Sequence, residues 1–168
     1  MALFESNSER AESYRILADL FFEPPDAETL RSIKEDLELD SKESEHDILA
    51  DFDALFVYPG GKLPPLESLH AEGKNITESV TRAYYSAGLT FEEEYELVPD
   101  HISLEFLFMS YLIDINNREL QGKFLEEHIA NWVPYYCDAV SKQANTLFYR
   151  EIAGIARDFV ELEHEVVG

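Results

Sequence analysis

The residues best suited to chemistry lie in the stretch VPDHISLE, from Val98 to Glu105. Asp100 and His101 follow a proline, and Glu105 comes four residues after His101, which places both side chains on one face of a helix. Pro99 fixes its own φ angle and restricts the residue before it, so the entry to this helix is rigid. We expect Asp100 to be the N-cap and His101 to lie in the first turn. Three polar groups would then meet at one rim.

An acidic run precedes this rim and adds to its charge. It places four carboxylates within five residues, at Glu92, Glu93, Glu94 and Glu96. Residues 83–117 contain seven acidic residues and no lysine or arginine. A negative patch beside the N–H groups of a helix N-terminus would attract arginine or lysine side chains. The alternative is purely structural, with Asp100 as a helix cap and the glutamates as a solvated loop.

A metal site is another reading of the same side chains. His101 and Glu105 have the spacing of a helical ligand pair, and His128 beside Glu127 is a weak second candidate. However, no second helix carries a convincing matching pair, and there is no cysteine cluster. We expect no metal here.

Catalytic motifs are equally hard to find. Ser68 and Cys137 are potential nucleophiles, but neither stands in a recognisable motif. Gly60 and Gly61 lack the lysine and hydroxyl of a phosphate-binding loop. We therefore expect neither catalytic residues nor a cofactor.

Charge narrows the class of partner. The 168 residues include 35 acidic and 13 basic ones, which gives a formal net charge of −22. Such a surface repels phosphate backbones and anionic lipid headgroups, so nucleic acid and membranes are poor partners. Basic peptides or proteins are better partners. The alternative is that the acidic residues serve only to keep the protein soluble.

The cysteine content and the N-terminus bear on the compartment. The single cysteine, Cys137, cannot form an internal disulfide, which indicates a reducing compartment. Its aromatic neighbours in the sequence indicate that its side chain packs in the core. The N-terminal residues MALFESNSERAES lack the basic start and apolar run of a secretory signal. No apolar run approaches the ~20 residues needed to span a bilayer. We expect a cytoplasmic protein without stable membrane insertion.

The elements that position these residues are predicted to be helices. Apolar residues recur at spacings of three and four, and no segment shows sustained alternation. The expected helices cover 11–21 after a cap at Ser8, 30–37 after a cap at Asp26, 48–56, 80–87 before a left-handed Gly88, 100–116, 124–132 with a break at Pro134, and 147–159. We predict an all-α bundle that forms a single domain over residues 1–168.

One long irregular segment interrupts these helices. Residues 58–74, YPGGKLPPLESLHAEGK, contain three prolines and three glycines, so no regular helix can span them. Long loops inside compact domains are usually functional or mobile. This one is a candidate for partner contact or for a hinge, which would allow either a monomer or a dimer that exchanges helices.

The order of the motifs resembles the TorD/DmsD/NarJ family of redox enzyme maturation chaperones. The matching stretches are, in order, YRILADLFFEPP, DFDALFVYPGGKLPPLESLH, AYYSAGL, ELVPDHISLEFLFM and HIANWVPYYCDAVSKQANTLFYREIA. The resemblance therefore covers nearly the whole chain. Its most specific piece is the proline-aspartate-histidine helix start followed by E-F-x-F-M.

This resemblance implies an all-helical chaperone with no reaction of its own. Such proteins bind the N-terminal twin-arginine signal peptide of a molybdopterin oxidoreductase catalytic subunit and hold the apoenzyme until cofactor insertion and export. The expected partners are that signal peptide and the apo-form of the subunit. Two guanidinium groups beside an apolar stretch call for carboxylates beside an apolar groove.

The resemblance also assigns the peptide-binding residues. The charged rim would consist of Pro99, Asp100, His101 and Glu105, with Asp100 or the neighbouring Glu96 pairing an arginine. The family's P-x-x-E-S loop and aromatic positions add Leu66, Glu67, Ser68, Tyr14 and Tyr84, although packing is the alternative role for both tyrosines.

One departure concerns the loop, and two other functions stay open. Where family members usually carry aromatic residues around the P-x-x-E-S motif, this chain has Leu66 and His70, which argues against an aromatic clamp for arginine. The alternatives are an acidic helical module for another basic partner, or a metal- or nucleotide-dependent enzyme using His101, Glu105 and His128.

Overall fold

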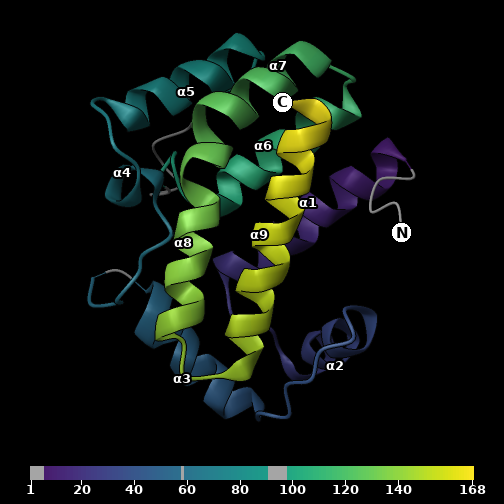
Figure 1. The fold of residues 1–168 in the computed structure, drawn as a ribbon, viewed down its shortest axis with the longest axis vertical. Helices are drawn as coiled ribbons and strands as arrows, with labels where there is room; N and C mark the ends of the chain where they lie inside the picture. The colour runs from purple at the N-terminus through teal and green to yellow at the C-terminus, as the bar shows by residue number, and fades with distance from the viewer. Residues whose placement is uncertain (1–5, 58, 91–97) are drawn as a thin grey trace.

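A computed structural model describes residues 6–57, 59–90 and 98–168 of the chain (Figure 1). These residues form helices and no strand, which confirms the predicted all-α class. In chain order the elements are α1 (Asn7–Phe22), α2 (Ala27–Asp36), α3 (Glu45–Phe56), α4 (Glu67–His70), α5 (Ile76–Ser86), α6 (Ile102–Asp114), α7 (Arg118–Phe124), the π-helical turn η2 (Leu125–Ile129), α8 (Ala130–Gln143) and α9 (Leu147–Val167). None of the described helices is long and apolar enough to cross a bilayer.

Local side-chain caps decide where the first helices begin. Asp26 accepts the N–H of Thr29 and caps α2, as predicted. The prediction of Ser8 as the cap of the first helix is wrong, because Ser6 accepts the N–H of Glu9 and α1 already starts at Asn7. Gly88 has the left-handed φ angle of +86° that was predicted for the end of α5.

The core is built around α6, the most apolar of the helices. Its buried residues include Ile102, Phe106, Met109 and Leu112, and they pack against the buried face of α1. The helices α8 and α9 lie side by side in front of this pair and are joined by a short turn (Figure 1). Burial of these apolar faces supplies the main driving force for the fold.

The helix that was expected to break at Pro134 continues through it. Helix α7, η2 and α8 follow one another without a gap, and Pro134 lies inside α8. A proline inside a helix removes one hydrogen bond and crowds the carbonyl four residues before it, but Trp132, Val133 and Tyr136 on either side are buried and hold the helix in place. The predicted break is therefore wrong.

The predicted irregular segment 58–74 is mostly irregular in its described part, but it contains α4. Gly73, with φ of +140°, and Asn75, with φ of +58°, turn the chain from this segment into α5. The segment passes the start of α6, where the backbone of Leu66 forms an isolated antiparallel bridge with that of His101. This bridge brings two predicted motifs together.

Candidate functional site

The start of α6 and the segment before α4 pair along their main chains. The N–H of Glu67 donates to the carbonyl of Asp100 at 3.0 Å, and the N–H of Ile102 donates to the carbonyl of Pro65 at 2.9 Å. These two hydrogen bonds flank the bridge between Leu66 and His101, so the two segments lie against each other like short antiparallel strands.

Asp100 does not cap α6, contrary to the prediction. It is fully buried, its Oδ2 accepts the N–H of Ser68 at 2.7 Å, and its Oδ1 accepts the hydroxyl of Thr77 at 2.9 Å. It therefore satisfies a backbone N–H at the start of α4 and a side chain at the start of α5. Because His101 still has an extended backbone, α6 begins one residue later than the prediction required.

His101 is the true N-cap of α6 and does not lie in its first turn. Its Nδ1 accepts the N–H of Ser103 at 3.0 Å, so this nitrogen carries no proton. Burial lowers the pKa of His101 to about 4, and the charge of Asp100 opposes this shift only in part. The imidazole is thus neutral at pH 7 and can act as a hydrogen-bonding group but not as a cation.

Glu67 and His128 form a buried pair between α4 and η2. The Nδ1 of His128 lies 3.0 Å from Oε2 of Glu67, and its Nε2 lies 3.2 Å from the hydroxyl of Ser79. His128 must donate from Nδ1, because a carboxylate can only accept. The π-helical turn η2 adds one residue to a turn of the continuous run of α7, η2 and α8, and so shifts the register of this run by one residue. Such turns are often found at functional sites.

Glu105 adds a second buried carboxyl beside Glu67. Its Oε1 accepts the indole N–H of Trp132 at 3.0 Å, whereas no described group donates to its Oε2. Burial first, and then the nearby charge of Glu67, raise the pKa of Glu105 well above its usual range. Both causes disfavour the charged form of the Glu105 carboxyl.

The two predicted tyrosines have different surroundings. Tyr84 belongs to the site, because its hydroxyl donates to the carbonyl of Pro99 at 2.7 Å. Tyr14 lies apart from it, fully buried between α1 and α9, where its hydroxyl donates to Glu163 at 2.9 Å. The same carboxylate accepts two hydrogen bonds from Arg10. These contacts give Tyr14 a role in packing.

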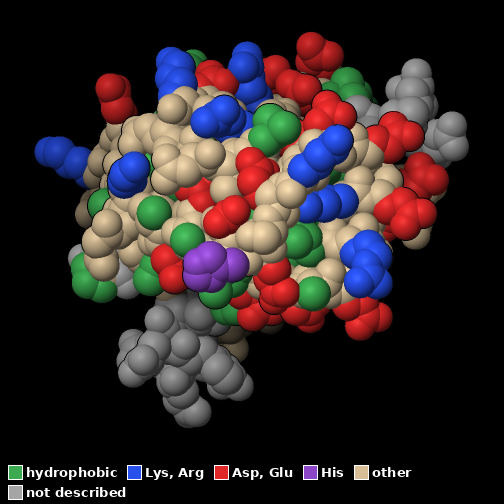
Figure 2. Space-filling model, turned by 90° about the horizontal axis from the view of Figure 1, so that it is seen from below, with side chains coloured by type: hydrophobic (Ala, Val, Ile, Leu, Met, Phe, Trp, Pro, Cys, Tyr) green, Lys and Arg blue, Asp and Glu red, His purple; other side chains and the backbone are tan. Residues whose placement is uncertain are grey.

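The predicted carboxylates meet, but not as an open rim. Glu67 is 2% exposed, and Asp100 and Glu105 are 0% exposed. Glu96 and the acidic run before it lie outside the described residues. On the end of the bundle in Figure 2, acidic side chains are scattered among lysines and arginines rather than gathered in one patch.

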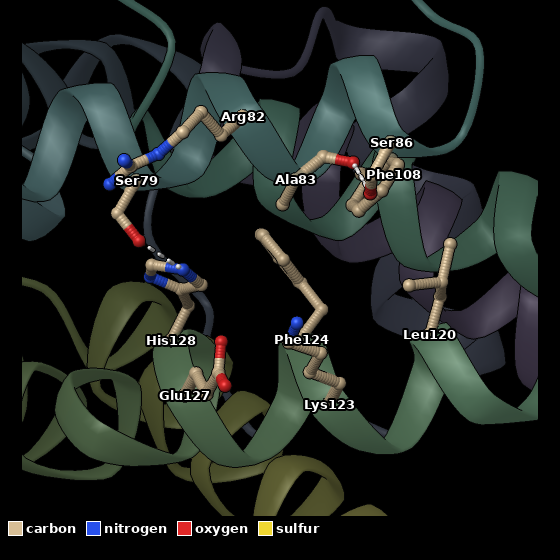
Figure 3. Close-up of a pocket in the computed structure, with 10 residues that line it drawn as sticks. All are labelled: Ser79, Arg82, Ala83, Ser86, Phe108, Leu120, Lys123, Phe124, Glu127 and His128. Atoms are coloured by element: carbon tan, nitrogen blue, oxygen red, sulfur yellow. Dashed lines mark hydrogen bonds between the residues drawn. The ribbon is translucent and has the colours of Figure 1, made fainter.

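A groove beside this cluster gives solvent access to its edge. A cavity of about 640 Å³ lies between α4, the start of α5 and the start of α8, and it is lined by Glu67, His70 and His128. A second cavity of about 280 Å³ continues from it between α5 and α7 (Figure 3). Both share Ser79 and His128 in their lining. The pair formed by Glu67 and His128 thus forms part of the groove wall.

Sequence reasoning missed several members of the cluster. Thr77, Ser79 and Trp132 carried no signal of a site, since each is an ordinary helical residue whose partner is distant in the sequence. His128 was considered only as a metal ligand or as a residue of a metal- or nucleotide-dependent enzyme. Among the residues that the structure describes, no group of three or more His, Cys, Asp or Glu side chains could hold a metal ion.

Comparison with known proteins gives the family. The sequence profile of the nitrate reductase delta subunit family matches residues 22–138, which is more than half of the chain. The chain belongs to this family. The match confirms the resemblance to the TorD/DmsD/NarJ chaperones. The matched range includes the buried carboxyl groups of Glu67, Asp100 and Glu105.

Two curated relatives carry chaperone names. The chain is 32% identical over 65 residues to a Haemophilus influenzae protein named for the Tat proofreading chaperone DmsD, a match that covers 39% of this chain and 32% of that protein. It is 30% identical over 118 residues to the Escherichia coli chaperone protein YcdY, covering 67% of this chain and 61% of YcdY. Each match thus covers less than two thirds of the relative's own length.

A solved structure agrees with the fold. It is a crystal structure of an Archaeoglobus fulgidus protein assigned to redox enzyme maturation, with a TM-score of 0.57 and 23% sequence identity. The match covers 91% of this chain and 92% of the other. At this identity the likeness concerns the all-helical architecture alone.

Proposed function

We propose that this member of the family is a cytoplasmic chaperone that binds the twin-arginine signal peptide of a molybdopterin oxidoreductase subunit. It would hold the apo-form of that subunit until the cofactor is inserted and the enzyme is exported. The family match and the chaperone names of two relatives support this proposal. The protein would act by binding, without a reaction of its own.

The observation that carries the proposal is the convergence of the predicted motif residues. The residues that lie together come from three separate stretches of sequence: Leu66, Glu67, Ser68, Tyr84, Pro99, Asp100, His101 and Glu105. Random placement of motif residues over a helical bundle would scatter them. Their meeting at one place fits a shared role in binding.

The chemistry of this place suits a cationic and apolar ligand. It contains the carboxylates of Glu67 and Asp100, which can form charge-assisted hydrogen bonds with guanidinium groups. Exposed apolar side chains surround it, since Leu69 is 55% exposed and Phe22, whose ring contacts that of His101, is 50% exposed. A peptide with two arginines next to an apolar run offers the complementary groups.

Calorimetric titration with synthetic peptides tests the proposal. A peptide with two consecutive arginines followed by an apolar run should bind, and its affinity should fall as the salt concentration rises. The matched peptide with both arginines replaced by glutamine should bind much more weakly. Equal binding of the two peptides would contradict the proposal and would favour a general module for apolar partners.

A further inference from the structure

Helix α4 is held in place by few and mainly polar contacts. It has four residues, far fewer than an isolated helix needs for stability. Its only buried residue is Glu67, a carboxylate, while Ser68 and Leu69 are exposed. Burial of apolar surface therefore contributes little to the position of α4, and specific hydrogen bonds must fix it.

Those hydrogen bonds resemble the contacts of a bound extended peptide. The main-chain edge of α6 at residues 100–102 accepts the N–H of Glu67 and donates to the carbonyl of Pro65. The side chain of Asp100 adds a hydrogen bond to the N–H of Ser68. A separate chain in extended conformation could form the same main-chain pattern, as in peptide recognition by strand addition.

With α4 in its observed position, three carboxyl groups also lie close to one another. Glu67 and Glu105 lie side by side in the interior, and Asp100 is buried close by. Burying charge is costly even when it is paired, as Glu67 is with His128. Removal of α4 would take Glu67 to solvent and would leave Asp100 and Glu105 facing the vacated edge.

The segment that carries α4 is followed by residues suited to a hinge. Residues 72–75 are all exposed. Within this exposed stretch, Gly73 and Asn75 have positive φ angles. A rotation of residues 66–71 as a unit would have to break the hydrogen bonds to Asp100, the pair of Glu67 with His128 and the stacking of His70 on Trp132.

From these observations we infer that residues 65–68 occupy the docking edge of the client peptide in the free protein. In the complex, the main chain of the peptide takes their place against residues 100–102, and α4 swings outward. The peptide arginines then meet the carboxylate of Asp100, which stays in the turn before α6. The inference deepens the proposed function and rests on it.

The fraction of molecules in which α4 is withdrawn would set the apparent affinity for the peptide. If only a fraction of molecules has α4 withdrawn, the apparent dissociation constant is the intrinsic one divided by that fraction. A change that loosens α4 without touching the docking edge should therefore tighten binding. A change that only damages a binding surface should weaken it.

Amide hydrogen exchange on the full chain tests the displacement directly. The probe is the synthetic twin-arginine peptide, added until binding saturates. The amides of Glu67 and Ser68 should exchange faster in the complex, because their acceptors on Asp100 are lost. The amide of Ile102 should stay protected, because a peptide carbonyl replaces that of Pro65.

The outcomes separate the two proposals. If the peptide does not bind, the proposed function fails and this inference falls with it. If the peptide binds while the amides of Glu67 and Ser68 keep their protection, α4 does not move, and only the inference is overturned.

The His70→Ala variant provides a second test. His70 holds α4 through Nε2, which lies 2.7 Å from the carbonyl oxygen of Pro64, and through its ring, which stacks on Trp132 with centroids 5.9 Å apart. The variant should bind the peptide roughly three- to tenfold more tightly. The control is His46→Ala, which removes an exposed histidine on α3. Equal affinity of the two variants, or weaker binding by His70→Ala, would overturn the inference.

Discussion

Asp100 caps a helix to which it does not belong, because its Oδ2 accepts the N–H of Ser68 in α4 at 2.7 Å. Its other oxygen accepts the hydroxyl of Thr77, at the start of α5. One buried side chain thus ties the entry to α6 to two other elements. A carboxylate with this many partners serves the fold as well as the candidate site.

Replacement of Asp100 should therefore lower the stability of the protein. Asp100→Ala leaves the N–H of Ser68 and the hydroxyl of Thr77 without an acceptor, and we expect a loss of roughly 2–3 kcal/mol in the free energy of unfolding. Asp100→Asn keeps the shape and one acceptor, so its loss should be smaller. Urea unfolding followed by circular dichroism measures both. Asp53→Ala, at an exposed position on α3, is the control and should change stability by less than about 0.5 kcal/mol.

Glu105 should make the protein less stable as the pH rises. Because burial raises its pKa in the folded protein, the folded state holds a proton that the unfolded chain releases above its ordinary value of 4.5. This contribution is complete below that pH and is lost as the pH rises toward the folded pKa. Glu105→Gln mimics the protonated carboxyl and keeps an acceptor for Trp132, so it should stabilise the protein at pH 7 by about 1 kcal/mol or more. Urea unfolding at several pH values measures the effect, and a loss of stability at pH 7 would show that Glu105 is ionised.

His101 gives a pH dependence of the opposite sign. Its pKa is about 4 in the folded protein, against 6.5 for an ordinary histidine. The unfolded chain therefore binds a proton first, and stability should fall by roughly 3 kcal/mol as the pH drops from 6.5 to 4. Above pH 6.5 this residue contributes no pH dependence.

The His101→Asn variant isolates this effect. Asparagine can still accept the N–H of Ser103 as an N-cap, but it does not titrate. Thermal unfolding between pH 4 and pH 7 should show a flatter profile for the variant than for the wild type. His101→Ala removes the cap as well and should lose about 1 kcal/mol at pH 7. Identical profiles of His101→Asn and wild type would mean that His101 does not titrate as stated.

The two tyrosines provide a matched pair of hydroxyl deletions. Tyr14→Phe removes the hydrogen bond to Glu163 and should cost about 1 kcal/mol of stability without changing peptide affinity. Tyr84→Phe removes the hydrogen bond to Pro99 at the site, so it should affect both stability and peptide affinity. Urea unfolding and calorimetric titration of the two variants distinguish packing from site roles. A weaker affinity for Tyr14→Phe would return this residue to the peptide site.

Much of the fold is encoded in short-range patterns. Apolar residues at spacings of three and four predicted the helices. The cap at Asp26 was predictable because its side chain accepts the N–H of Thr29, only three residues further along the chain. The left-handed Gly88 also follows from local backbone preference. Such features depend on neighbours along the chain, and the sequence contains all the information that they need.

The sequence indicated part of the candidate site, but not its other members or its arrangement. The order of the motifs indicated residues around Glu67 and Asp100, and the structure brings them together. The sequence did not indicate that they would be buried, that Ser79 and His128 would join them, or that Pro134 would stay within a helix. These outcomes depend on which helices pack against each other.

The difference between the features that the sequence predicted and those that it did not has a physical cause. The amino-acid sequence by itself determined the helices and the motif residues, because hydrogen bonds within a helix and caps at its ends link residues three or four positions apart. Only the tertiary structure decided the raised pKa of Glu105, the pairing of Glu67 with His128, and the partner of Asp100. A pKa and a buried ion pair depend on the solvent excluded and the charges brought near by segments 32 to 61 residues away in the chain.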